Sequence, residues 1–134
     1  MSTVLLDLWT DAATIATRLS TPSARLTLII GATAWCETCR TLKPVFESLA
    51  AEHGEENDTW LWLDLEDHAE FLDDFIPESL PLLVSYKGSQ LTHVLVPSHI
   101  NAAALADLLA QSPRIEQDTV PDIRARLMAV DWAT

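Results

Sequence analysis

The chain has 134 residues and a formal net charge of −12, because 20 acidic side chains outnumber eight Lys and Arg. Hydrophobic residues make up 49% and glycine occurs three times, which indicates one soluble globular domain rather than a disordered chain. No apolar run approaches the roughly 18 residues of a membrane span. Because the negative charge opposes nucleic acid and anionic membrane surfaces, we expect neither as a partner.

The first half of the chain predicts helices and strands in alternation. Apolar residues at helical spacing begin after Asp11 and end before Pro22, which predicts a first helix. Residues 25–33 form a short, nearly continuous apolar run, typical of a strand covered on both faces. A second helix is predicted from the cysteines to Gly54, with an apolar stripe formed by Leu42, Val45, Phe46, Leu49 and Ala50. Residues 59–65 predict a second buried strand.

The middle of the chain predicts a short helix and a hairpin. Asp67 followed three residues later by Glu70 favours a helix that reaches about Phe75. Residues 81–87 and 90–96 predict an antiparallel pair of strands that turns at Gly88 and Ser89.

The last third of the chain predicts two helices. Over residues 98–111 the buried side is expected to consist of Ile100, Ala104, Leu105, Leu108 and Leu109. In the tail from 113 to 134, a helix start is marked by Thr119, Pro121 and Asp122, and its apolar stripe is Ile123, Leu127 and Val130. We therefore expect a domain over 1–112 and a C-terminal extension over 113–134, with one short helix docked on that domain.

The chain's two cysteines, Cys36 and Cys39, stand two residues apart where a strand gives way to a helix. At a helix start the first sulfur lies among unpaired backbone N–H groups and the positive end of the helix dipole, which favour the nucleophilic thiolate. The second cysteine lies about one turn further in and is close enough to resolve a mixed disulfide. The spacing therefore predicts that Cys36 attacks and Cys39 resolves.

The chain resembles the thioredoxin family over residues 1 to about 112. Three features carry the resemblance: "WCETC" at a strand-to-helix junction, Pro44 five residues after Cys39, and the strand "LPLLVSYK" that opens with a proline. The resemblance implies an α/β fold, a three-layer α/β/α sandwich around a mixed central sheet, and thiol–disulfide exchange. It also implies that Trp35 is the aromatic neighbour of the cysteines and that Leu80–Pro81 is a cis bond facing the disulfide.

The sequence departs from the family's pattern around the cysteines. Typical thioredoxins carry an aspartate six residues before the first cysteine, buried beneath the pair, and here that position is Ile30. The aromatic residues at the next positions are replaced by Gly31 and Ala32, and the Gly-Pro between the cysteines is replaced by Glu37 and Thr38. A carboxylate at Glu37 disfavours the Cys36 thiolate, against the helix dipole, and so favours the disulfide and a lower reduction potential. The resemblance implies that loss of the family's proline makes the centre more oxidising, so we expect an intermediate redox poise.

Several side chains have a structural role as an alternative to a functional one. The cysteines could be two inert thiols or half of a zinc site, but a second pair of ligands with metal-site spacing is missing, so no metal is expected. The four histidines and Arg40 are expected at the surface, and the acidic stretch 64–74 is expected to be a solvated helix face. Packing is expected for the remaining tryptophans, which are Trp9, Trp60, Trp62 and Trp132.

These features predict a thiol–disulfide oxidoreductase that exchanges the Cys36/Cys39 dithiol with protein or small-thiol partners. It would use no bound cofactor, and a reductase or glutathione would supply the electrons. The N-terminus lacks the basic region of a secretory signal, which predicts a cytoplasmic protein, and a monomer is expected. One alternative is a binding module that holds a partner around Trp35, Leu80 and Pro81 with little redox catalysis. A thiol peroxidase is a further alternative, although the expected peroxidatic surroundings are missing.

Overall fold

The computed structural model describes most of the chain, namely residues 11–20, 24–34, 36–53, 58–66, 80–88, 90–97, 99, 101–116 and 122–129. The short helix predicted over 67–75 lies outside these residues, as do Trp9, Trp35, Ile100, Val130 and Trp132. Within the described ranges, no helix is both long enough and apolar enough to cross a membrane.

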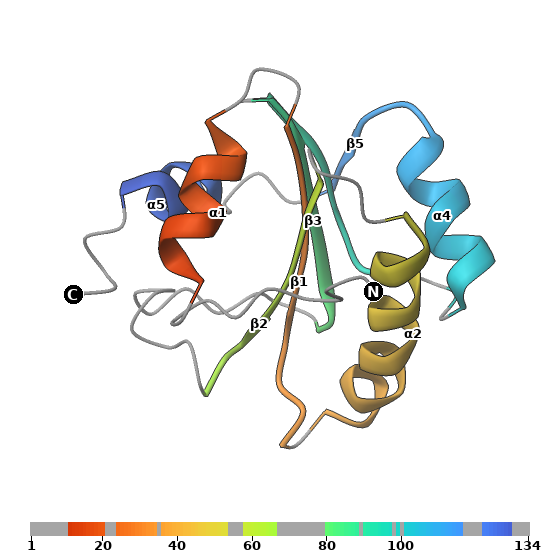
Figure 1. Ribbon diagram of the computed structural model, residues 1–134. Helices are drawn as coiled ribbons and strands as arrows, with labels where there is room; N and C mark the ends of the chain where they lie inside the picture. The colour runs from red at the N-terminus through yellow and green to blue at the C-terminus, as the bar shows by residue number, and fades with distance from the viewer. Residues whose placement is uncertain are drawn as a thin grey trace.

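Helices and strands form three layers (Figure 1). In chain order the elements are α1 (Ala12–Leu19), β1 (Arg25–Gly31), α2 (Glu37–His53), β2 (Asp58–Asp64), β3 (Leu82–Lys87), β4 (Gln90–Leu95), α4 (Ala102–Ala110), β5 (Arg114–Ile115) and α5 (Ile123–Ala129). Helices α1 and α5 cover one face of the sheet, and α2 and α4 cover the other. This arrangement confirms the predicted α/β/α sandwich.

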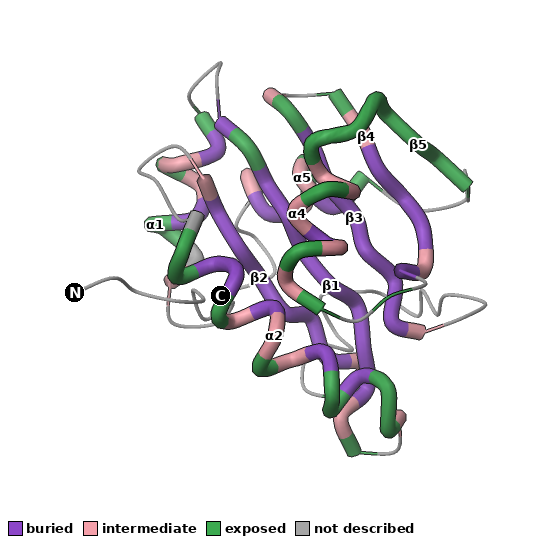
Figure 2. Tube along the Cα trace, turned by 90° about the vertical axis from the view of Figure 1, so that its right-hand side faces the viewer, coloured by how far each residue is buried: buried purple, intermediate pink, exposed green. Residues whose placement is uncertain are grey.

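The sheet is mixed, with strand order β2-β1-β3-β4-β5. Strand β1 runs parallel to β2 and antiparallel to β3, and β4 runs antiparallel to β3 and parallel to β5. Strands β1 and β2 are buried over almost their whole length, as their continuous apolar runs predicted (Figure 2). Between β3 and β4, Gly88 has a φ of 59°, a left-handed conformation that glycine adopts without steric cost.

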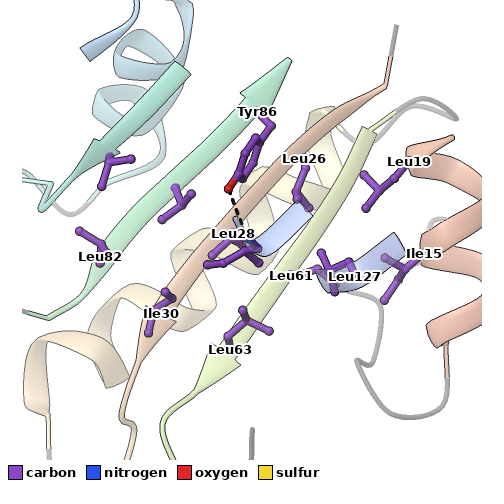
Figure 3. Packing of buried hydrophobic residues seen from close by; sticks show 13 residues of the cluster. Ile15, Leu19, Leu26, Leu28, Ile30, Leu61, Leu63, Leu82, Tyr86 and Leu127 are labelled. Carbon is purple, nitrogen blue, oxygen red and sulfur yellow. Dashed lines mark hydrogen bonds between the residues drawn. The ribbon is translucent and has the colours of Figure 1, made fainter. Parts of the chain in front are cut away.

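The core on the α1 side joins elements from both ends of the described chain (Figure 3). Ile15 and Leu19 of α1 lie in one buried cluster with Ile123 and Leu127 of α5. The backbone N–H of Ile123 donates a hydrogen bond of 3.2 Å to the hydroxyl of Tyr86 on β3. Helix α5 is therefore packed into the core, while the division of the chain at residue 112 stays a prediction.

The core on the α2 side places the cysteines. The buried part of the α2 stripe consists of Leu42, Phe46, Leu49 and Ala50, as predicted, with Val45 half-buried. Trp60 and Trp62 of β2 pack in the same cluster, and the Phe46 and Trp60 ring centroids are 5.5 Å apart. The predicted packing role of these two tryptophans is confirmed.

His93 is a correction to the sequence analysis, which placed every histidine at the surface. It lies on β4, is only 3% exposed, and pairs with Ser85 of β3 and Arg114 of β5. Burial lowers the pKa of His93, while the backbone at Gln111 and Leu108 acts in the opposite direction. The two-residue strand β5 was not predicted, because it is too short to carry a pattern, and it pairs with β4 at His93.

Candidate active site

The first cysteine lies at the N-terminal end of α2. The backbone N–H of Cys36 donates to the carbonyl of Ala32 at 2.8 Å, and the carbonyl of Cys36 accepts from the N–H of Arg40 at 3.1 Å. The Cys36 sulfur accepts a hydrogen bond of 3.2 Å from the backbone N–H of Cys39. Cys36 thus takes the position of a helix N-cap, with its sulfur serving where a capping oxygen usually does.

The two thiols differ in exposure, and burial of Cys39 has a consequence for its proton. Both cysteines are free, Cys36 is half-buried, and Cys39 is 0% exposed. Burial raises the pKa of Cys39 to about 11, and the hydrogen bond with Cys36 and the negative charge of Asp64 act in the same direction. Cys39 therefore keeps its proton near neutral pH, and Cys36 is the sulfur that solvent can reach.

Ile30 does not lie beneath the cysteines, contrary to the position obtained by counting back from Cys36. Its side chain packs in the α1-side cluster with Leu28 and Leu63, whereas Cys39 belongs to the cluster on the other face (Figure 3). Side chains alternate between the two faces of a strand, so the residue that faces Cys39 is the next one, Gly31. A Cβ atom at Gly31 would lie 3.2 Å from the Cys39 sulfur.

The indole of Trp62 fills the space over Gly31. A Cβ atom at Gly31 would lie 2.8 Å from Cζ2 and 3.3 Å from Cη2 of Trp62, closer than ordinary van der Waals contact allows. The Lys43 ammonium lies 5.8 Å from the centroid of the Trp62 ring. An aromatic ring thus lies beside Cys39 at the strand position where a side chain on β1 would otherwise project. Sequence reasoning gave Trp62 a packing role but missed this contact.

The remaining site residues from the sequence analysis divide into exposed and buried groups. Glu37, Thr38 and Arg40 are exposed, and the Arg40 Nη1 donates to the carbonyl of Thr33 at 3.0 Å. Leu80 is half-buried and packs against both core clusters, and Cys36 packs against the α2-side one. Pro81 is buried, and the Leu80–Pro81 peptide bond is cis.

The sequence analysis placed Asp64 both in the strand predicted over 59–65 and in the acidic stretch 64–74, which was expected to be a solvated helix face. Asp64 ends β2 and is 6% exposed, so the strand prediction is confirmed and the solvated face is wrong for this residue. Its Oδ2 accepts hydrogen bonds from the backbone N–H and the hydroxyl of Thr33, both at 3.1 Å, and its Oδ1 accepts from the N–H of Glu66 at 3.0 Å. The available signal was its position at the carboxyl end of a buried strand beside the strand that leads to the cysteines.

The chain is similar to known proteins in sequence and in fold. The chain is 30% identical over 114 residues to the bifunctional thioredoxin reductase/thioredoxin of Mycobacterium leprae, covering 85% of this chain and 22% of that protein. It is 33% identical over 79 residues to the thioredoxin of Alicyclobacillus acidocaldarius, covering 57% of this chain and 74% of that one. Thioredoxin NaTrxh of Nicotiana alata shares the fold with a TM-score of 0.61 at 14% identity, over 84% of this chain and 95% of that one. No protein-family model matches the chain.

The fold and the Cys-x-x-Cys pair at a helix start define a thioredoxin-like protein with a dithiol site. The sequence matches to two thioredoxin proteins agree with that class, and the chain belongs to the thioredoxin family.

Proposed function

We propose that this protein reduces or forms disulfides by exchange with the Cys36/Cys39 dithiol. The observation that carries the proposal is the asymmetry of the two thiols: Cys36 caps α2 and is reachable, while Cys39 is buried one helical turn away. Such an asymmetry suits one sulfur to attack an external disulfide and the other to resolve the product.

In the reducing direction, the Cys36 thiolate attacks one sulfur of the substrate disulfide, whose S–S bond breaks. The departing thiolate takes up a proton, and a Cys36–substrate disulfide remains. Cys39 then loses its proton and attacks the Cys36 sulfur, which releases the second substrate thiol. The substrate gains two electrons and two protons, and the protein is left with a Cys36–Cys39 disulfide.

The substrate class that fits this chemistry is a protein disulfide, and electrons would return from a reductase or glutathione. The M. leprae relative is described as both a reductase and a thioredoxin, which supports a reductase as the donor. Leu80 and Pro81 would form the substrate-facing edge, with Trp35, Glu37, Thr38 and Arg40 around the cysteines. A cytoplasmic location and a monomeric state complete this proposal.

The test is reduction of insulin by dithiothreitol, with and without the purified protein. Wild type should accelerate insulin precipitation, and Cys36→Ser should abolish the acceleration because the attacking sulfur is gone. The exposed substitution Asp107→Asn on α4 serves as the matched control and should behave as wild type. A wild-type protein that gave no acceleration would instead favour the binding-module alternative.

A further inference from the structure

A buried carboxylate next to the dithiol has no part in the exchange steps above. Asp64 is the one carboxylate among the buried polar residues of the described part of the chain. Its oxygens accept hydrogen bonds from the backbone N–H and hydroxyl of Thr33 and from the N–H of Glu66. A buried carboxylate with donors on both oxygens differs from a solvated surface charge.

The register of the sheet brings Asp64 close to Cys39. Asp64 is the partner of Gly31 across the parallel pair β1 and β2, and neighbouring strands lie roughly 4.8 Å apart. By alternation along β2, Asp64 shares the face of Trp60 and Trp62, which pack with Cys39. Gly31 adds no side chain, and a Cβ there would already be 3.2 Å from the Cys39 sulfur. Asp64 therefore lies one strand spacing from the residue that faces the buried thiol.

Asp64 also holds the loop between β1 and α2. Thr33 donates twice to the Asp64 carboxylate, and the carbonyl of Thr33 accepts from Arg40 in the first turns of α2. Ala32, next to Thr33, accepts the hydrogen bond from Cys36. The position of the Cys36 backbone is thus connected through two adjacent loop residues to the end of β2.

We propose that Asp64 is a positioning residue of the dithiol, which fixes the β1–α2 loop through Thr33 and holds a negative charge beside Cys39. The proposal deepens and rests on the exchange function proposed above. The proposal places the buried charge on β2, on the sheet face that carries the cysteines. Position 30, where typical thioredoxins carry the buried aspartate, lies on the opposite face of the sheet. Burial is the main cause of the raised pKa of Cys39, and the Asp64 charge adds to it by opposing formation of the thiolate.

Other charged or titratable groups on this face come from four elements. They are Cys36, Glu37, Arg40 and Lys43 at and within the start of α2, Glu66 after β2, His93 on β4, and Asp107 on α4. His93 is buried, Cys36 and Lys43 are half-buried, and the other four are exposed, so solvent screens those four. From β1 and β3 the same cluster receives the apolar Ile29 and Leu83. Removing the Asp64 charge should therefore change the pKa of Cys39 more than removing a charge at the surface does.

The experiment titrates Cys39 in a Cys36→Ser background through the carbon-13 chemical shift of its labelled Cβ. Adding Asp64→Asn should lower the titration midpoint, with about two- to threefold more thiolate at a given pH below it, the order of size expected for the loss of one nearby charge. Adding Glu66→Gln, the matched exposed carboxylate, should leave the midpoint unchanged. Because no turnover is involved, this titration can fail while insulin reduction succeeds, and the reverse.

Two further variants separate charge from loop geometry. Thr33→Val removes one of the loop's hydrogen bonds and keeps the charge, so the midpoint should stay at the Cys36→Ser value. If Asp64→Asn does not fold, Asp64→Ser replaces it, because a hydroxyl can still accept from Thr33 without charge. An unchanged midpoint in the Asp64 variant, or an equal shift with Thr33→Val, overturns the proposed role of the charge.

Discussion

Replacing Gly31 with alanine tests the contact between β1, Trp62 and the buried thiol. The added Cβ would lie 2.8 Å from Trp62 Cζ2 and 3.2 Å from the Cys39 sulfur. The Trp62 ring is 6% exposed and lies in the same buried cluster as Phe46, so it has little room to move. We expect Gly31→Ala to destabilise the reduced protein.

The magnitude follows from two opposing terms. Overpacking of a buried site costs about 1–3 kcal/mol, and the lower freedom of alanine in the unfolded chain offsets about 0.4–1 kcal/mol. The expected net loss is about 1–2 kcal/mol. With an unfolding entropy of about 2.1 cal/mol/K per residue over 134 residues, this loss lowers Tm by about 4–7 °C.

The assay is thermal and urea unfolding followed by circular dichroism under reducing conditions, for a double-mutant cycle with Trp62→Leu. Leucine removes the indole atoms that the new Cβ would meet, so Gly31→Ala should cost almost nothing in that background. We expect a coupling energy of about 1 kcal/mol or more. An unchanged Tm for Gly31→Ala, or the same cost in both backgrounds, would refute the proposed contact.

Three further predictions concern the thiols and two buried side chains. In the reduced protein Cys36 should react with iodoacetamide well before Cys39, and equal alkylation rates would contradict the assigned roles. The Cys39→Ser variant should retain mixed disulfides between Cys36 and its substrates, because the resolving sulfur is gone. Ile30→Asp should lower the free energy of unfolding by about 3–5 kcal/mol without speeding insulin reduction, whereas a stable, faster variant would place position 30 beneath the cysteines after all. His93 has a lowered folded-state pKa, so unfolding takes up protons and stability should fall as pH drops below about 6.5. His93→Gln should flatten that dependence in urea titrations, and a dependence equal to that of wild type would contradict the buried-histidine assignment.

Local patterns in the sequence were sufficient for most of the fold. The apolar run of β1 and the helical stripe of α2 each identify an element and its buried side. The cysteine spacing at their junction then identifies the site, because a helix start supplies the N–H groups around Cys36. These inferences need only neighbours within a few residues.

The sequence-based predictions that were wrong concern residues whose neighbours in the fold are far away in sequence. His93 is polar, and its buried position lies beside segments that are distant in sequence: β5 pairs with β4 there, and the backbone at Leu108 and Gln111 acts on its ring. Ile30 was assigned by counting across the loop to Cys36, and a shift of one residue transfers a side chain to the opposite face of a strand. Asp64 was grouped with its acidic neighbours, although its hydrogen-bond partner Thr33 is far away in sequence.

The two cores differ in how far along the chain their partners come from. The α2-side core is assembled from residues between Ile29 and Leu105, whereas the α1-side core joins Ile15 to Leu127. Because closing a long loop costs entropy, we expect contacts between such distant segments to form late. Helices α1 and α5, which pack on each other, are therefore expected to dock last and to exchange their amide hydrogens together as one cooperative unit. The layer that carries the cysteines can then stay protected while the opposite layer opens.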